Sequence, residues 1–296
     1  MATSKGELVL VTGAAGRTGR ACIAALLRQG TPIRALVRRP EAAADLQTLG
    51  VAETLLGDLT DADLWDEATR GVTRVLHICP PMHPQETDLA KGLIDASKRT
   101  GVKQFVLYSV LHPSIDVPHH RRKLVAEEYL INSGLPYTIL QPGRYMAHLL
   151  PIWRAVLETG VHAMPFSVTS KFSLVHLDDL GAAAALVLQG DAHHFATYQL
   201  AGPQALSMTQ CAATIADVLG RDIRADHIPL DVFLERARAA GANEQRLNVM
   251  KVMNLHYDHH GLVGNPNVLR WLLGRDLKTY KDYVEDLADQ SAARPN

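Results

Sequence analysis

Long hydrophobic runs are absent from this chain of 296 residues, and no stretch is long enough to span a lipid bilayer. The N-terminal segment also lacks the charged and apolar regions of a secretory signal, because it leads directly into a strand pattern. Cysteine is scarce: Cys22, Cys79 and Cys211 lie far apart and form neither a CxxC pair nor a disulfide ladder. These absences argue against a membrane protein and a secreted, disulfide-stabilised domain, and we expect a cytoplasmic protein without a membrane partner.

An excess of one charge is also missing. The chain has 30 lysines and arginines and 31 aspartates and glutamates, so its net charge is −1. Because no overall field attracts the protein to polyanions, we expect no nucleic-acid partner. Two local basic segments, Arg38-Arg39 and Arg121-Arg122-Lys123, are exceptions to this balance. Internal repeats and low-complexity linkers are absent as well, and the length suffices for one large α/β domain with a smaller companion.

Strand-like and helix-like segments alternate over the first half of the chain. The expected strands are 7–12, 32–37, 52–56, 72–78, 102–108 and 137–140, and the expected helices are 17–29, 41–49, 61–69, 83–100 and 121–132. This βαβ alternation predicts an α/β fold with a doubly wound parallel sheet of the Rossmann type. The strands are almost continuously apolar, which agrees with helices on both faces of the sheet.

The pattern changes after Pro142-Gly143. We expect a helix over 145–158, a strand near 172–175 and mostly helices beyond it. This second part is too short for another Rossmann unit. The sequence therefore predicts a Rossmann domain over residues 1–150 and a smaller, mostly helical substrate lobe over 151–296. Strands near 172–175 and 197–201 are expected to return to the first domain.

Glycines are concentrated directly after the first predicted strand, where residues 13–19 read GAAGRTG, a GxxGxxG pattern. Glycine permits a tight turn, close approach of a pyrophosphate and close packing of helix on strand, while the helix N-terminus faces the negative charge. Between a strand and a helix, the pattern predicts that a dinucleotide contacts Gly13, Gly16, Arg17, Thr18 and Gly19. The alternative is a glycine-rich turn of purely structural use.

The end of the second predicted strand selects the dinucleotide. NAD-binding folds place an acidic residue there, which accepts a hydrogen bond from the ribose 2′-hydroxyl. This chain instead has Arg38-Arg39-Pro40. Guanidinium groups pair with a 2′-phosphate, whereas a carboxylate would repel it. We therefore predict NADP(H) as the cofactor, bound by Arg38 and Arg39 with Arg17 as a further cation; the alternative is two solvated surface arginines.

Further cofactor contacts follow from position at the strand ends. Asp58 and Leu59 follow the third strand, where an acid can accept a hydrogen bond from the adenine amine. Cys79 and Pro80 follow the fourth strand and are expected near the adenosine ribose. Cys79 is expected to be a buried apolar residue, because no adjacent base or cation would activate its thiol. Pro142 lies where the sixth strand leaves the sheet beneath the expected nicotinamide site.

Several longer segments together resemble a known family. They are TGAAGRTG, VRRP, GDLTD, LYSV, HHRRKLVAEEYL and SGLPYTILQPGRYM, followed by FSLVHLDDLGAAAA and GLVGNPNVLRWLLGR. These segments look like the NmrA-like branch of the atypical short-chain dehydrogenases/reductases, and the resemblance covers nearly the whole chain. It implies a Rossmann sheet, a preference for NADP(H) and a small C-terminal lobe that closes over the nicotinamide. The group includes quinone, triphenylmethane-dye and phenylpropanoid reductases, and also regulators that bind NADP(H) without turnover.

The catalytic pattern of the wider superfamily is altered in this chain. Short-chain dehydrogenases usually have Tyr-x-x-x-Lys on a helix, where the lysine lowers the pKa of the tyrosine and binds the nicotinamide ribose. Here Lys123 occupies the lysine position and His119 the tyrosine position. Imidazole can act as a general acid near neutral pH, so His119 is a candidate proton donor; the alternative is a solvated capping residue. Ser109, at the end of the fifth strand, is a candidate substrate-facing residue.

Tyr145 is another candidate proton donor, because it follows the sixth strand close to Pro142. Tyr145, Met146, Leu149 and Trp153 could instead form one apolar helical face in the core. If they line a pocket, that pocket is large and apolar and suits an aromatic or conjugated substrate.

Three other groups of residues have structural interpretations. His256, His259 and His260 lack the HExxH arrangement, so we expect no metal site. The pair Asp178-Asp179 is expected to cap a helix over 180–188. The pair Glu127-Glu128 is expected on a solvated helix face.

Two functions from different classes remain. The first is an NADPH-dependent reductase that transfers hydride to a conjugated or aromatic small molecule such as a quinone, enone, aldehyde or dye. The second is a regulatory protein that senses NADP(H) without turnover. The retained Lys123 favours the reductase, and the lost tyrosine keeps the regulator open. The sequence also leaves a homodimer open.

Overall fold

The computed structural model describes residues 7–293, which fall into two units. Unit 1 contains the chain up to Pro142 together with Leu177–Tyr198. Unit 2 contains Gly143–His176 and the chain from Gln199 onward. The chain thus leaves unit 1 after its sixth strand and returns once, for a helix, the loop that follows it and the start of one more strand.

The central sheet of unit 1 has seven strands in the order β10-β6-β5-β4-β1-β2-β3. Their bounds are β1 Val9–Val11, β2 Ile33–Val37, β3 Glu53–Leu56, β4 Arg74–His77, β5 Gln104–Tyr108, β6 Tyr137–Pro142 and β10 Ala196–Leu200. The six strands from β1 to β6 pair in parallel. The predicted doubly wound parallel sheet is therefore confirmed, and the order reverses between β1 and β4, which is where such sheets bind ligands.

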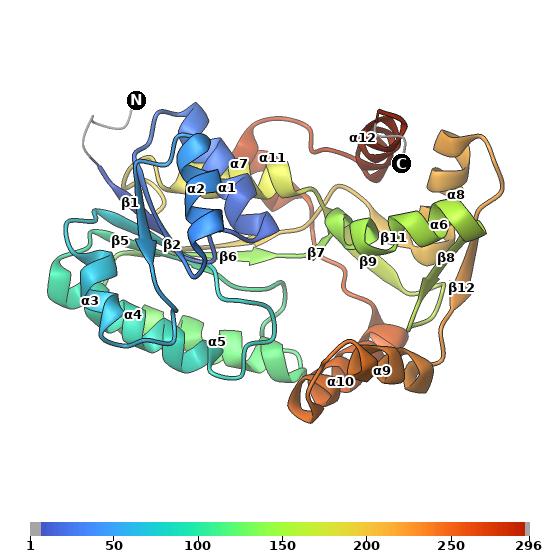
Figure 1. Ribbon diagram of the computed structural model, residues 1–296, viewed down its shortest axis with the longest axis horizontal. Helices are drawn as coiled ribbons and strands as arrows, with labels where there is room; N and C mark the ends of the chain where they lie inside the picture. The colour runs from blue at the N-terminus through green and yellow to red at the C-terminus, as the bar shows by residue number, and fades with distance from the viewer. Residues whose placement is uncertain (1–6, 294–296) are drawn as a thin grey trace. The chain divides into compact units, whose positions relative to one another are not determined.

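Helices cover both faces of this sheet, with α1, α2 and α7 on one face and α3, α4 and α5 on the other (Figure 1). Their bounds are α1 Arg17–Arg28, α2 Pro40–Thr48, α3 Leu64–Thr69, α4 Glu86–Thr100, α5 Pro118–Ile131 and α7 Leu177–Val187. On the second face, Leu93 and Ile94 of α4 pack with Phe105 of β5, and all three are fully buried. Helix α5 begins three residues before the expected start because a proline is favoured in the first helical turn.

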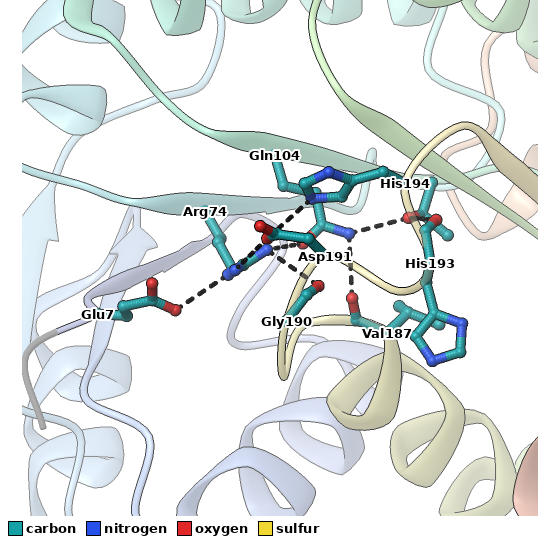
Figure 2. A network of polar contacts seen from close by, with 9 residues as sticks. Glu7, Arg74, Gln104, Val187, Gly190, Asp191, His193 and His194 are labelled. Carbon is teal, nitrogen blue, oxygen red and sulfur yellow. Dashed lines mark hydrogen bonds and ion pairs between the residues drawn. The ribbon is translucent and has the colours of Figure 1, made fainter. Parts of the chain in front are cut away.

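The amino ends of β4 and β5 are held by one buried arginine (Figure 2). Arg74, 3% exposed, contacts the carboxylates of Glu7 at 3.2 Å and Asp191 at 3.0 Å. It also donates hydrogen bonds to the side chain of Gln104 at 2.5 Å and to the carbonyl of Gly190 at 3.3 Å. The loop after α7 is thereby fixed to the sheet. A buried guanidinium is tolerated here because its donors are satisfied.

Unit 2 contains two small sheets, ordered β11-β9-β7 and β12-β8. Its strands are β7 Arg144–Tyr145, β8 Val161–Met164, β9 Lys171–Val175, β11 Ala205–Ser207 and β12 Arg224–His227. Its helices are the 3₁₀ helix η1 Met146–Ile152, α6 Trp153–Thr159, α8 Met208–Leu219, α9 Leu230–Ala239, α10 Glu244–His260, α11 Asn267–Leu273 and α12 Tyr280–Ala292.

Two expectations for this region are wrong. The helix expected over 145–158 is a strand residue, a 3₁₀ helix and a short α-helix, because Pro151 cannot donate the backbone hydrogen bond that a continuous helix needs. The strand expected near 172–175 forms as β9, but it pairs with β7 and β11 and does not join the large sheet. The strand expected near 197–201 does join that sheet, as β10.

Candidate functional site

The glycines of the 13–19 loop are required by close backbone contacts. Gly13 has φ +62°, and a Cβ there would lie 2.5 Å from the carbonyl oxygen of Ile78. A Cβ on Gly19 would lie 2.3 Å from the carbonyl oxygen of Gly13. Gly16 precedes α1 and provides no side chain that could cap the helix, and the first turn has no acidic residue. The amide groups at this N-terminus are therefore suited to a phosphate.

Exposed cations lie at the carboxyl end of β2. Arg38 is 73% exposed, and its guanidinium lies 3.6 Å from the carboxylate of Asp58. Arg17 and Arg39 are also exposed. Asp58 accepts hydrogen bonds from the backbone and hydroxyl of Thr60 at 2.9 and 2.8 Å. These bonds, and then the charge of Arg38, lower the pKa of Asp58, so its carboxylate is ionised at neutral pH.

The residues predicted along the third and fourth strand ends are mostly buried. Leu59 is 8% exposed, and its carbonyl accepts a hydrogen bond from the indole of Trp65 at 2.8 Å. Cys79 is 9% exposed, and burial is the main cause that raises the pKa of its thiol to about 12. A thiol with that pKa is not a nucleophile at neutral pH. Pro80, which follows, is more exposed.

Lys123 is held by an acidic residue that the sequence analysis did not single out. Its ammonium lies 2.5 Å from the carboxylate of Glu86, the first residue of α4, and donates to the carbonyl of Tyr108 at 3.3 Å. Glu86 is 3% exposed, and its second oxygen has no hydrogen-bond partner within residues 7–293. The sequence signal for it was an acidic residue at the start of the fourth helix. Lys123 is thereby fixed beside the carboxyl end of β5.

His77, the last residue of β4, is a second group that sequence reasoning missed. It is fully buried, and its Nδ1 lies 2.9 Å from the hydroxyl of Thr12, which follows β1. Its Nε2 has no partner in the described chain. Burial, and then the charge of Lys123, lowers the pKa of His77 to about 3. His77 is therefore neutral at physiological pH.

His119 lies inside the first turn of α5 and is 8% exposed, so the solvated capping residue is excluded. Its ring packs edge-on against His120, with 4.6 Å between centroids. Burial lowers the pKa of His119 to about 3. The nearby His120, Lys123 and Arg122 contribute to a smaller extent. At neutral pH this imidazole is uncharged. It is therefore not an imidazolium acid near neutral pH, but its neutral ring can act as a hydrogen-bond donor.

Ser109 lies directly after β5 and is 3% exposed. Its hydroxyl donates a short hydrogen bond to the carboxylate of Glu127. Gln141 donates to both oxygens of the same carboxylate at 3.0 Å. Glu127 is 5% exposed, and burial raises its pKa against the effect of these hydrogen bonds. The expectation that Glu127 lies on a solvated face is wrong, because its side chain turns toward the sheet.

Tyr145 belongs to unit 2, where its ring stacks on His148 with 5.4 Å between centroids. Both side chains line a small, partly open pocket, together with Met146 and Leu149. Trp153 is buried outside that lining and donates a hydrogen bond to Ser291 at 2.8 Å. Of the four residues that could form an apolar face or line a pocket, Tyr145, Met146 and Leu149 line the pocket, and Trp153 packs in the core.

The remaining groups of the sequence analysis have other surroundings. Asp178 and Asp179 lie inside the first turn of α7, so they do not cap it from outside. Pro142 is the buried last residue of β6, and its carbonyl accepts a hydrogen bond from the backbone of Leu111 at 2.8 Å. Within residues 7–293, no three His, Cys, Asp or Glu side chains are grouped as a metal site would require. No helix in that range has the length and apolarity to cross a membrane.

The geometry of unit 1 is thus that of a dinucleotide-binding sheet, and comparison with known proteins places the chain more closely. The family model described as the NmrA-like family matches residues 5–285. The chain belongs to the NmrA-like family. The resemblance found in the sequence is therefore confirmed.

Three proteins to which the chain is similar have named activities. The chain is 29% identical to an NAD(P)H azoreductase of Xenophilus azovorans over 280 residues, which cover 94% of this chain and 97% of the relative. It is similar to the NADPH complex of the NADPH-dependent quinone oxidoreductase 2 of Escherichia coli, with TM-score 0.83 and 27% identity. The match covers 95% of this chain and 99% of the other. It is also similar to the NADP(H) complex of triphenylmethane reductase from Citrobacter sp., with TM-score 0.82 and 25% identity. The match covers 94% of this chain and 99% of the other.

Proposed function

We propose that this protein is an NADPH-dependent reductase that transfers hydride to a quinone, a dye or another conjugated small molecule. The observation that supports this most strongly is the match, over more than nine-tenths of the chain, to an azoreductase, a quinone reductase and a dye reductase. The protein is an NADP(H)-dependent oxidoreductase with a small-molecule substrate, as the sequence predicted.

The residues of unit 1 fit the cofactor. A Cβ on Gly13 or Gly19 would occupy space that the backbone already fills, so the loop geometry is specific to glycine. We propose that this loop, with Thr18 and the N-terminus of α1, binds the pyrophosphate and that Arg17, Arg38 and Arg39 bind the 2′-phosphate. Asp58, Leu59, Cys79, Pro80 and Pro142 are proposed to lie along the cofactor at the strand ends. Bound NADPH supplies the hydride.

Lys123 is proposed to bind the nicotinamide ribose. Glu86 orients its ammonium at 2.5 Å, so that the side chain has one fixed direction. His119 is proposed to donate a hydrogen bond from a neutral imidazole, and Ser109, held by Glu127, belongs to the same unit. Tyr145 of unit 2 remains a candidate proton donor. No member of this set is a strong acid at neutral pH.

The lack of a strong acid among these candidate residues favours conjugated acceptors. A quinone or a cationic dye delocalises the electron pair that it receives, so it needs little stabilisation at one oxygen. A simple ketone forms a localised alkoxide and needs a proton donor. The experiment measures the loss of NADPH absorbance with quinones, enones, aromatic aldehydes, dyes and aliphatic ketones. Turnover of quinones or dyes supports the proposal, and turnover of aliphatic ketones alone would refute the preference.

We also propose a cellular location, a class of partner and an assembly state for the protein. Three buried, separate cysteines and the absence of a strong net charge support a cytoplasmic protein without a nucleic-acid partner. A homodimer is proposed as the assembly to test, and light scattering after size exclusion measures it directly.

A further inference from the structure

The ends of β2 and β3 place a cation and an anion side by side at the carboxyl edge of the sheet in unit 1. Val37 and Leu56 are paired in the parallel register, and the backbone of Gly57 donates to the carbonyl of Val37 at 2.9 Å. The side chains of Arg38 and Asp58, which follow these strand ends, meet at 3.6 Å between a guanidinium nitrogen and a carboxylate oxygen. Arg38, the proposed ligand of the 2′-phosphate, therefore has an acidic neighbour from the next strand.

Asp58 is held by its own turn rather than by Arg38. One carboxylate oxygen accepts hydrogen bonds from the backbone and the hydroxyl of Thr60 at 2.9 and 2.8 Å, and the other oxygen faces Arg38. The bonds from Thr60 are the largest causes that lower the pKa of Asp58. The carboxylate therefore keeps its place and its charge when the guanidinium turns away from it.

Arg38 is the weakly held partner of the pair. Its side chain is 73% exposed, and the 3.6 Å contact is longer than the roughly 2.7–2.9 Å of a charge-assisted hydrogen bond. Exposed ion pairs of this geometry contribute little to stability, so Asp58 fixes the direction of the guanidinium only weakly. The main effect of Asp58 on Arg38 is the attraction between their charges.

A 2′-phosphate changes the balance at this point. It carries a charge of about −1.5 to −2 and binds guanidinium groups through paired hydrogen bonds. Arg38 then has to leave the carboxylate, which stays beside the phosphate as a like charge. NADH has a hydroxyl at the same position, so it neither requires the guanidinium nor repels the carboxylate. The charge of Asp58 therefore opposes the binding of NADPH and not that of NADH.

We propose that Asp58 is a specificity-determining residue that limits the preference for NADPH over NADH, because its carboxylate competes with the 2′-phosphate for Arg38 and repels it. This inference rests on the proposed binding of the 2′-phosphate by Arg38, and it does not depend on turnover. It is also separate from a contact between Asp58 and adenine, because such a contact would affect both cofactors equally and would leave the ratio of their affinities unchanged.

The test is calorimetric titration of the full chain with NADP⁺ and NAD⁺, which differ only in the 2′-phosphate, at low and at high salt. Asp58→Asn removes the charge and keeps an oxygen that accepts the hydrogen bonds of Thr60, so the turn is retained. Asp63→Asn is the matched control, because Asp63 is an exposed carboxylate on the segment that follows. Arg38→Ala and the double variant with Asp58→Asn complete the cycle, and thermal unfolding checks that each variant is folded.

We expect Asp58→Asn to raise the ratio of the NAD⁺ to the NADP⁺ dissociation constant by about two- to fivefold, the value of one exposed ion pair. The gain should decrease at high salt, because exposed charges are screened. It should also be smaller in the Arg38→Ala background, since the competition for the guanidinium is then absent. Asp63→Asn should change the ratio by less than about 1.5-fold.

An unchanged or lower ratio in Asp58→Asn would overturn the proposal, and a lower ratio would make Asp58 a residue that orients Arg38 for the phosphate. An equal gain in Asp63→Asn would also overturn it, because the effect would then belong to the net charge. An equal gain with and without Arg38 would rule out the competition and overturn the proposal as well.

Two further outcomes separate this inference from the proposed function. Equal affinities of the wild type for NADP⁺ and NAD⁺ would refute the assignment of Arg38 and, with it, this inference. Tight NADP⁺ binding without oxidation of NADPH by any acceptor would refute the reductase, while the effect of Asp58→Asn on the ratio would still support the role of Asp58.

Discussion

The two ends of the parallel sheet in unit 1 both bury charged groups, but they treat them differently. At the amino end, Arg74 contacts Glu7, Gln104, Gly190 and Asp191 (Figure 2). At the carboxyl end, the described chain leaves individual atoms of buried side chains without hydrogen-bond partners. These atoms are Nε2 of His77, Oε2 of Glu86 and Nδ1 of His119.

The difference shows how one fold separates stability from function. A buried polar group that finds no partner destabilises the empty protein, so native structures keep few of them. His77 and Glu86 lie at and after the end of β4, beside the switch in strand order, so we expect ligands to complete this end of the sheet. At the amino end the charged group, Arg74, has its partners in the chain and is expected to serve folding, although Oγ1 of Thr31 and Nε2 of His194 there also lack a hydrogen-bond partner within residues 7–293.

The largest expected effect is at the amino end. Arg74→Met removes the cation from a buried network and should lower the free energy of unfolding by about 3–5 kcal/mol, measured with denaturant. Arg99→Met is the matched control, because Arg99 pairs with Asp66 at the surface with 56% exposure. A loss at Arg74 no greater than at Arg99 would contradict the structural role.

At the carboxyl end, Lys123→Met should lower kcat/KM by roughly 100-fold and weaken NADPH binding, because it removes the proposed ribose anchor. It also leaves the 3%-exposed Glu86 without its cation. The double variant Lys123→Met with Glu86→Gln should therefore regain stability but not activity. If the double variant regains activity, Lys123 acts only as the counter-ion of Glu86.

His119→Gln should lower turnover and leave NADPH binding nearly unchanged. It should also change acid stability. The folded pKa of His119 is about 3 against 6.5 for an ordinary histidine, so the unfolded chain takes up the proton first. Its contribution to stability is complete above pH 6.5 and is lost as the pH falls toward 3. The variant should reduce the slope of unfolding free energy in that range by about 1 kcal/mol per pH unit, and an unchanged slope would place His119 in solvent.

The smallest expected effect concerns Arg38, which is 73% exposed. The wild type should bind NADPH at least about tenfold more tightly than NADH, which equals about 1.4 kcal/mol. Arg38→Ala should remove most of that difference while NADH binding stays the same. Titration with both cofactors measures it, and equal affinities in the wild type would contradict the assignment.

Much of unit 1 could be predicted from sequence because its signals are local. The apolar strands and the glycines at 13, 16 and 19 depend on neighbouring residues and on backbone geometry. The start of α5 was missed by three residues, although Pro118 offered the signal. With Pro118 placed in the first turn, His119 belongs to the helix and is buried.

The features that the sequence did not predict depend on contacts between distant residues. Glu127 resembles a surface residue in sequence, yet Ser109 and Gln141 from two strand ends donate to it. Glu86 and Lys123 are 37 positions apart and meet only in the folded sheet. Strand β9 forms close to the expected range 172–175, but its partner strands could not be predicted from its own residues. Periodicity identifies an element and its buried face, whereas pairing requires the tertiary structure.

The central claim is that chemistry belongs to the carboxyl end of the sheet and stability to the amino end. The most direct test measures the rate of NADPH oxidation by a naphthoquinone in the wild type, Arg74→Met and Lys123→Met, at a temperature where all three are folded. The account predicts similar rates for the wild type and Arg74→Met, and a rate lower by roughly 100-fold for Lys123→Met. A wild type that binds NADPH tightly and oxidises none of it, or a Lys123→Met rate equal to that of the wild type, would contradict the account.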